Sequence, residues 1–464
     1  MRHLIVLYDD NRKPNRKICD ITGNKSFGET IFKRVSLRDR TAEMVNAAGI
    51  CSEFVNIEEY DFDGRSNISF MKLYSDMAIN DEKAFKVLLE KSLYAKDCYK
   101  ITCRGKIAAV IYPNEEALLA NDSEEDFFEI VTGAFTDLSE WAVFRRFITS
   151  GFDSRYFNEL EGDEYTVIKH SANKEKLKKE YNFYGLLPDR MKMWFAMPFS
   201  FTENEKEASY SMERFHMTDL AIRYVHGAVS TDEFREILEK LFRFITVRQI
   251  KEVTDEEYLE NARELYVDKV ISRVELLKEN PKFERLNNLI KCAASYDGLE
   301  EIVKRYISLY EKIMPKKSFK PLLVVGHGDL CFSNILYSRE ASFIKLIDPK
   351  GADTEDELYM NPYYDLAKLS HSICGQYDYF NSDLYEIVLD DDMHISLKLS
   401  SENDEYIEIF KEYLKKYDLD YKLIRLYETS LFLSMLPLHI DREKKVLGFV
   451  LNALRIMDEI ENDL

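Results

Sequence analysis

Apolar and polar residues follow different rhythms in successive parts of this chain. In the first part, the short apolar runs HLIVLY (3–8) and KIAAVIYP (106–113) are typical of buried strands. The segments 39–50 and 81–95 repeat apolar residues every three or four positions, which predicts helices. Strands and helices therefore alternate over residues 1–140, as in a small α/β module.

The pattern changes near residue 147. Strand-like segments separated by polar turns predict an antiparallel sheet over 147–216, with one helix inserted at 174–187. From residue 217 onward the spacing is mostly helical, apart from one stretch at 324–351. We therefore expect an α+β protein, in which a small sheet lobe (147–216) and a large helical lobe (217–464) follow the α/β module.

Composition excludes several classes of function. The chain has 464 residues and is 45% hydrophobic, which is sufficient for packed cores. Its 64 basic and 84 acidic residues give a net charge of −20, which would repel a nucleic-acid backbone. The first apolar run is too short for a signal peptide, and no window is long enough to span a membrane. The seven cysteines form no CxxC pair or zinc spacing, so we expect reduced, idle thiols in a cytoplasmic protein.

The candidate chemistry lies in VVGHGDLCFSNILYSREASFIKLIDPKG, residues 324–351. One apolar run leads into a turn that exposes Asp329, and another ends at Asp348, with Asn334 between them. Two strands joined by a turn would bring these oxygen-bearing side chains to one rim, where they would suit Mg²⁺. A carboxylate that is free of the metal can accept the proton of an attacking hydroxyl, which is the division of labour that phosphoryl transfer needs. The alternative is an Asp-rich turn with a structural role only.

HGDLCFSNIL followed by LIDPKG resembles the catalytic and metal-binding segments of the aminoglycoside phosphotransferase and choline kinase superfamily, which has a two-lobed protein-kinase-like fold. The resemblance implies that Asp329 is the catalytic base and that Asn334 and Asp348 bind Mg²⁺. His327 would shape the catalytic turn, a role that an ordinary buried histidine also fits.

A kinase-like fold implies an ATP site upstream. Lys169, near the end of YTVIKHS, would meet the α- and β-phosphates of ATP. Glu180 on the following helix would pair with Lys169, and Glu175 is a weaker substitute. Charged residues at this spacing are often only the solvated face of a helix.

The remaining nucleotide contacts come from two further segments. ASYSMERFHMTDL resembles the hinge of the superfamily, in which Met212, Glu213 and Phe215 would cover the adenine. An ordinary edge strand has the same pattern. Gly151, in TSGFDSRYF, is the single glycine of the expected phosphate-covering loop.

Downstream, NPYYDLAKLSHSICGQYDYF places Asp365 near a helix start, where capping and core packing are the favoured roles. Together with IDPKG, this segment resembles a branch of the superfamily found with capsule and surface-polysaccharide biosynthesis proteins.

The implied function is ATP- and Mg²⁺-dependent phosphorylation of a hydroxyl on a small molecule, either a sugar or an amino alcohol. A noncatalytic kinase-fold scaffold and a bifunctional kinase with an N-terminal nucleotidyltransferase are the alternatives. The sequence gives no oligomeric state.

The first 140 residues faintly resemble parts of the sugar-phosphate nucleotidyltransferase fold, through the segments 28–50 and 70–91. The residues after the first strand include Arg and Lys but no glycine cluster, so we expect a degenerate, noncatalytic module. Asp9, Asp10 and Asp76 are its candidate metal ligands, although exposed turn acids are the favoured interpretation.

Overall fold

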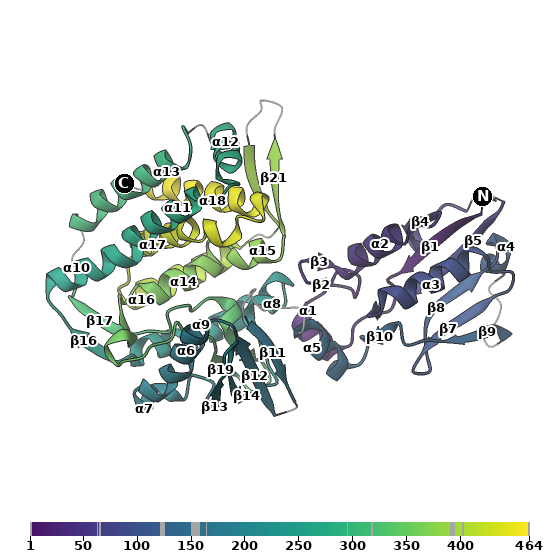
Figure 1. Cartoon of the computed structure of the whole chain (residues 1–464), viewed down its shortest axis with the longest axis horizontal. Coiled ribbons are helices and arrows are strands. Elements are labelled where there is room, and N and C mark those ends of the chain that lie inside the picture. Colours follow the sequence, from purple (N-terminus) through teal and green to yellow (C-terminus); the bar gives the residue numbers. More distant parts are fainter. Residues whose placement is uncertain are drawn as a thin grey trace. The chain divides into compact units, whose positions relative to one another are not determined.

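The computed structural model describes residues 2–62, 64, 66–120, 126–149, 158–163, 165–294, 296–316, 319–389, 395–400 and 403–462 (Figure 1). The chain divides into two compact units. The first contains Met1–Asp153 together with Ile222–Ala228, and the second contains Ser154–Ala221 and Val229–Leu464. The α+β architecture expected from the sequence is confirmed, because both units combine sheets with helices.

The first unit is built on a six-stranded mixed sheet in the order β4-β1-β5-β8-β7-β9. Its strands are β1 (His3–Asp9), β4 (Ser52–Asn56), β5 (Ile68–Tyr74), β7 (Tyr99–Cys103), β8 (Lys106–Tyr112) and β9 (Phe128–Val131). Strand β1 runs parallel to both of its neighbours, which explains its continuous apolar run: strands inside parallel sheets are buried on both faces.

Helices and short hairpins complete the first unit. The helices are α1 (Arg16–Thr22), α2 (Leu37–Ala47), α3 (Glu82–Leu93), α4 (Glu115–Leu119) and α5 (Trp141–Thr149). The hairpins pair β2 (Ile31–Phe32) with β3 (Val35–Ser36) and β6 (Met77–Ile79) with β10 (Phe135–Asp137). The predicted helices at 39–50 and 81–95 correspond to α2 and α3, whose apolar faces pack on the sheet.

The first unit also includes a segment from the middle of the sequence. Helix α8 (Leu220–Val225) contributes Ile222 to an apolar cluster with residues of α1 and α5. The imidazole Nε2 of His226 accepts a hydrogen bond of 2.9 Å from the backbone N–H of Ile31, and burial lowers the pKa of His226 to about 4. This histidine is therefore neutral, as an acceptor must be.

The small lobe of the second unit is an antiparallel sheet in the order β11-β12-β14-β13. Its elements are β11 (Asn158–Gly162), β12 (Thr166–Ser171), α6 (Lys174–Leu186), α7 (Asp189–Lys192), β13 (Pro198–Glu203) and β14 (Ala208–Glu213). The side chain of Asn173 caps α6 by accepting a hydrogen bond from the backbone N–H of Lys176. Leu177 and Phe183 face the interior from the same side of this helix as Glu180.

The large lobe is mainly helical. It contains α9 (Thr231–Val247), α10 (Asp255–Arg263), α11 (Lys269–Lys278), α12 (Phe283–Ala294), α13 (Leu299–Ile313), α14 (Tyr364–Ile373), α15 (Tyr377–Asn381), α16 (Asp404–Lys416), α17 (Tyr421–Ser434) and α18 (Glu443–Asn462). A π-helical turn over Glu264–Asp268 joins α10 to α11. Among the described helices, none combines the length and the apolar character that crossing a lipid bilayer requires.

Short strands surround the candidate catalytic stretch. One sheet has the order β15 (Thr218–Asp219), β18 (Ile335–Ser338) and β19 (Phe343–Leu346), and another has the order β16 (Ile250–Glu252), β17 (Leu322–Val325) and β20 (Tyr359–Met360). A hairpin of β21 (Tyr385–Leu389) and β22 (Ile395–Leu399) interrupts the helices. The expectation that β17 and β19 form one pair of strands was wrong, because they lie in different sheets and β18 is the partner of β19.

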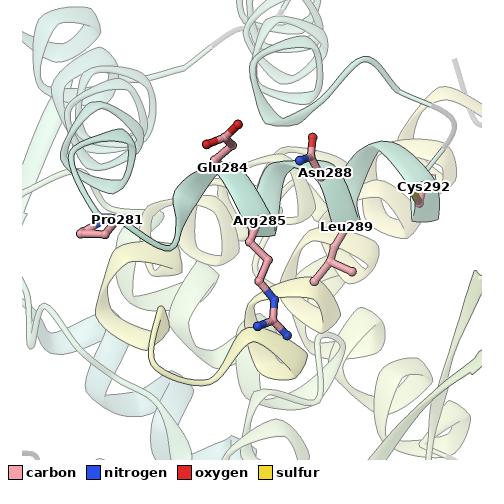
Figure 2. Close-up of a pocket in the computed structure, with 6 residues that line it drawn as sticks. All are labelled: Pro281, Glu284, Arg285, Asn288, Leu289 and Cys292. Carbon is pink, nitrogen blue, oxygen red and sulfur yellow. The ribbon is translucent and has the colours of Figure 1, made fainter.

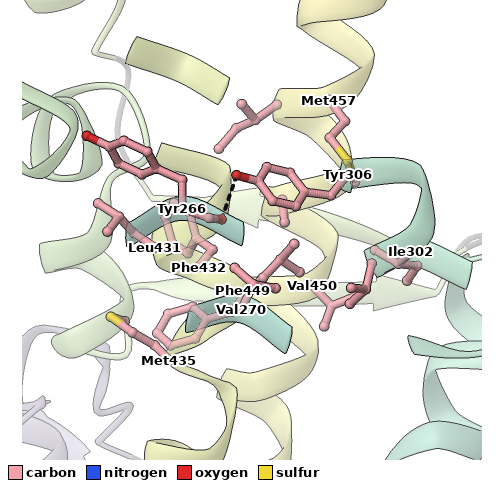
Figure 3. Close-up of a cluster of buried hydrophobic side chains, with 14 of the residues drawn as sticks. Tyr266, Val270, Ile302, Tyr306, Leu431, Phe432, Met435, Phe449, Val450 and Met457 are labelled. Atoms are coloured by element: carbon pink, nitrogen blue, oxygen red, sulfur yellow. Dashed lines mark hydrogen bonds between the residues drawn. The ribbon is translucent and has the colours of Figure 1, made fainter. Parts of the chain in front are cut away.

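The core of the large lobe surrounds α17 and α18 (Figure 3). The ring of Tyr266 stacks on that of Tyr427, with centroids 3.6 Å apart. The hydroxyl of Tyr306 donates a hydrogen bond of 2.9 Å to the backbone carbonyl of Tyr266 (Figure 3). That carbonyl lies within the π-helical turn, so the core fixes the position at which α11 begins.

Candidate active site

Lys169 is the centre of a buried charge cluster in the second unit. Its ammonium lies 2.5 Å from a carboxylate oxygen of Glu180 on α6 and 2.9 Å from one of Asp348. Burial alone would lower the pKa of Lys169, but the carboxylates of Asp348 and Glu180 outweigh it and raise that pKa. The side chain of Lys169 therefore remains protonated. Glu175, the weaker candidate partner, is exposed in the first turn of α6.

The segment after Asp348 is held against α6 by main-chain contacts. Gly351 has a φ of 85°, and a Cβ atom there would lie 2.8 Å from the backbone nitrogen of Glu180. The backbone N–H of Ala352 donates to the carbonyl of Lys179. Asp348 itself is in the left-handed region at φ 56°, a conformation that is uncommon for non-glycine residues but that Asp adopts more readily than most.

The loop between β17 and β18 brings Asp329 and Asn334 together. The side-chain amide of Asn334 donates to the backbone carbonyl of Asp329 at 2.8 Å and to its Oδ2 at 3.1 Å. The backbone carbonyl of Asn334 accepts from Ile347, the residue before Asp348. The three residues predicted from the sequence therefore occupy neighbouring positions on two hydrogen-bonded segments.

His327 is fully buried and both of its ring nitrogens bond to main-chain groups. Nδ1 accepts from the backbone N–H of Asp329 at 3.1 Å, and Nε2 donates to the carbonyl of Ile347 at 2.9 Å. Burial lowers the pKa of His327, which keeps the imidazole neutral. The ring stacks on Phe195 of the small lobe. This geometry joins the two segments and leaves no nitrogen free for proton transfer.

The side chain of Asp365 holds the loop between β17 and β18, a role that the sequence analysis did not anticipate. Its carboxylate is fully buried at the start of α14 and accepts hydrogen bonds of 2.9 Å from the backbone N–H groups of His327 and Gly328. The buried guanidinium of Arg248 lies 3.4 Å away. Asp365 therefore orients the loop that carries Asp329. The expected burial in the core agrees with the structure, but the expected capping role was wrong, because in the described part of the chain Tyr363 is the N-cap of α14 and no side chain caps it.

Lys368 is the second functional candidate that was missed. Its ammonium lies 2.9 Å from Oδ1 of Asp329, and only 12% of its side chain is exposed, against 23% for Asp329. Burial would lower the pKa of Lys368, but the negative charge of Asp329 dominates and raises it. The spacing Asp365-x-x-Lys368 puts both on one face of α14, which is the signal that the sequence carried.

The expected hinge residues occupy different environments. A small enclosed hollow of about 20 Å³ lies between the lobes of the second unit. Its lining includes Glu180, Tyr210, Met212, Leu346 and Asp348. Met212 thus lines this hollow, whereas Glu213 is exposed and Phe215 is half-buried under Lys345. Ligand pockets usually measure at least about 300 Å³, so nucleotide binding requires this cleft to open. Gly151 lies outside the described residues.

The donor set near Asp348 fits Mg²⁺. In the described part of the chain, no group of three or more His, Cys, Asp or Glu side chains is arranged as a metal site. Mg²⁺, however, is commonly held by one or two protein oxygens together with water and substrate phosphates. The amide nitrogen of Asn334 donates to Asp329, so the amide oxygen is the atom that a cation would meet. The backbone of Asn334 bonds to Ile347, the residue before Asp348. Asn334 and Asp348 would therefore hold the ion.

Similar solved structures are aminoglycoside phosphotransferases. A thermostable mutant of APH(4)-Ia in its apo form is 10% identical, with a TM-score of 0.39, covering 68% of this chain and 98% of that one. APH(3'')-Id from Streptomyces rimosus, in complex with ADP and streptomycin, is 15% identical, with a TM-score of 0.33, covering 65% of this chain and 98% of that one. No protein-family model and no curated protein matches the sequence.

A larger hollow, of about 470 Å³, contains none of the predicted residues. Figure 2 shows that its lining comes from α12 and the turn before it, including Arg285, Asn288 and Cys292. One face of a single helix offers no convergent polar groups, so this hollow is not the candidate site.

Asp9, Asp10 and Asp76 of the first unit were expected to be exposed turn acids rather than metal ligands, and the exposure was wrong for all three. Asp9 is 6% exposed and Asp76 is 2% exposed, because each pairs with internal cations. Asp9 lies 3.0 Å from Lys72, and Asp76 lies 3.0 Å from Arg12 and 2.7 Å from Lys106. Half-buried Asp10 accepts hydrogen bonds from the hydroxyl of Ser26 and the backbone N–H of Gly28. All three carboxylates are thus satisfied by the protein itself.

Proposed function

We propose that this chain is an ATP- and Mg²⁺-dependent phosphotransferase that phosphorylates a hydroxyl group of a small molecule, in surface-polysaccharide or related metabolism. The observation that carries the proposal is the buried ammonium of Lys169, shared between Glu180 and Asp348, directly beside the loop that presents Asp329. Burying three charged groups together costs free energy even when they are paired, and a lysine held between two carboxylates is what binding of nucleotide phosphates needs in kinase-like sites.

Each residue has a role that follows from its position. Lys169 would contact the α- and β-phosphates, and Glu180 holds it in place. Asp329, which is partly exposed, would accept the proton of the acceptor hydroxyl as that oxygen attacks the γ-phosphate. Mg²⁺ held by Asn334 and Asp348 would neutralise charge on the phosphates. His327 shapes the turn and takes no proton.

We propose that the first unit is noncatalytic. Asp9 is neutralised by Lys72, and Asp76 by Arg12 and Lys106, so a metal bound at either carboxylate would have to displace these cations. A bifunctional enzyme would instead release pyrophosphate from CTP or UTP, and the Asp76→Asn variant would lose that release.

The test is phosphate transfer from labelled ATP by the full chain, with Mg²⁺ and a panel of sugars, sugar phosphates, choline and ethanolamine. We expect transfer to at least one acceptor, and a loss of about 10²–10⁴-fold in kcat for Asp329→Asn with nucleotide affinity retained. Asp356→Asn is the matched control, because that side chain is 84% exposed and pairs with Lys251 at the surface.

Two results would contradict the proposal. Transfer that survives undiminished in Asp329→Asn removes Asp329 from the role of base. Tight binding of Mg-ATP without transfer to any acceptor favours the noncatalytic scaffold instead.

A further inference from the structure

A continuous row of polar side chains leads away from Asp329 along α14. The ammonium of Lys368 lies 2.9 Å from Asp329. Tyr364 is four residues before Lys368 on the same helix, so the two residues share one face, with about 5–6 Å between their Cβ atoms. The hydroxyl of Tyr364 accepts a hydrogen bond of 2.9 Å from the ammonium of Lys269. Lys269 therefore stands at one end of the row and Lys368 at the other, and Asp329 lies next to Lys368.

The π-helical turn places the far cation. Lys269 is the first residue of α11, directly after Glu264–Asp268. A single π-turn shifts the residues that follow it around the helix axis, and such turns are frequent at functional sites. Among the described residues, the partner of the Lys269 ammonium is the neutral hydroxyl of Tyr364 and no carboxylate pairs with it. Lys269 is half-buried, so it can still meet a ligand from solvent.

The row carries two lysines, although the whole chain carries −20. The acids next to it in sequence, Asp268 and Asp365, pair with Arg263 and Arg248. On the acidic side, Asp329 is matched by Lys368. Burial raises the pKa of Asp378 to about 7, so this carboxylate is partly neutral. Burial would also raise the pKa of Tyr364, yet the charges of Lys269 and Lys368 lower it.

We propose that Lys269 and the Tyr364 hydroxyl, at the far end of the row from Asp329, receive an anionic group, phosphate or carboxylate, carried by the hydroxyl acceptor. The inference rests on the proposed function, because it takes Asp329 as the base toward which the acceptor hydroxyl is turned. Tyr364 lies one helical turn before Lys368, so an anion at Lys269 and the Tyr364 hydroxyl is set apart from the contact between Lys368 and Asp329. An amine acceptor would instead bring a second cation against Lys269.

Lys368 has a different part in the same site. It acts through Asp329, whose carboxylate it holds in one orientation, and is a positioning residue. We expect Lys368→Met to lower kcat, with partial rescue by Lys368→Arg, whereas Lys269→Met raises KM for the acceptor and leaves kcat unchanged. A merely structural role for either lysine would not produce this split between kcat and KM.

The decisive experiment is calorimetric binding of four small probes to the full chain saturated with AMP-PNP and Mg²⁺. Glycerol, glycerate and glycerol 3-phosphate share one carbon skeleton and differ in charge, and ethanolamine is the cationic probe. We expect both anionic probes to bind at least about tenfold more tightly than the other two, which is about 1.4 kcal/mol. The ratio of glycerate to glycerol 3-phosphate separates carboxylate from phosphate recognition.

The variants decide whether the row is responsible. Lys269→Met should abolish the preference for anions, and Lys416→Met should keep it, because Lys416 is an exposed lysine already paired with Glu239. Equal binding of the four probes, no binding of any, or an unchanged preference in Lys269→Met would overturn the inference. A chain that binds the anionic probes but transfers phosphate to no acceptor would contradict the proposed function and leave the anion site standing.

Discussion

The contact between Asp365 and the catalytic loop offers the sharpest test of how this site is held. The carboxylate accepts two backbone N–H groups at 2.9 Å each and faces the buried Arg248 at 3.4 Å. Asp365→Asn keeps the shape of the side chain, but an amide has only one oxygen. Its NH₂ group must therefore face a backbone N–H in either orientation: that of Gly328, or that of His327 together with the guanidinium of Arg248.

The magnitude follows from these contacts. Leaving one buried backbone N–H without an acceptor costs roughly 1–3 kcal/mol. Removing one partner of a buried ion pair typically costs about 3–5 kcal/mol. Arg248 retains hydrogen bonds to the backbone carbonyls of Ile245 and Pro362, which limits the second cost. Because the two effects overlap, we expect a total destabilisation of about 3–5 kcal/mol.

Thermal unfolding followed by circular dichroism measures this effect, and we expect the transition of the second unit to fall by roughly 5–10 °C. Asp356→Asn is again the control, since losing its exposed pair with Lys251 should cost less than about 1 kcal/mol. If Asp365→Asn shifts the transition no further than Asp356→Asn does, the idea that Asp365 holds the loop is refuted.

Three further outcomes can be measured. Lys169→Met leaves Glu180 without its buried cation, so a fluorescent ATP analogue should bind at least about tenfold more weakly, whereas Lys169→Arg should retain most of the affinity. Burial raises the pKa of Asp378 from 3.8 to about 7, so the folded state binds more protons than the unfolded state over that range and stability falls as the pH rises from about 4 to 7. In Asp378→Asn, the free energy of unfolding measured with urea should depend less on pH between about 4 and 7. An unchanged pH dependence would contradict the raised pKa of Asp378. Exposed Cys292 should react rapidly with iodoacetamide at pH 8, whereas buried Cys331, whose pKa is raised to about 12, should not react. Mass spectrometry of the treated protein identifies which cysteine is modified.

Local patterns were sufficient for much of the fold. The runs 3–8 and 106–113 form β1 and β8, and the helical spacing at 174–187 forms α6, because apolar periodicity decides which face of an element is buried. The hairpin of β21 and β22 was missed, since its residues are half-exposed and lie between strongly helical segments. The assignment of β17 and β19 to separate sheets depends on pairing between distant segments, which periodicity does not encode.

The candidate site was predictable where its residues follow one another in order. Asp329, Asn334 and Asp348 are close in sequence, and the structure holds their segments together. Asp365 and Lys368 were not anticipated as neighbours of the loop. Their roles depend on the packing of α14 beneath it, and an Asp and a Lys three residues apart also describe the solvated face of many helices.

The membership of Ile222–Ala228 in the first unit has a practical consequence for anyone who cuts this protein into pieces. A fragment that stops at residue 153 lacks Ile222 and the imidazole of His226, so it exposes an apolar surface and strands the amide of Ile31. The complementary fragment keeps the segment Ile222–Ala228 but lacks the apolar residues of α1 and α5 that cover Ile222. Gene truncations at 153 should therefore yield insoluble halves, and coexpression or a circular permutant is the sounder route to separated pieces.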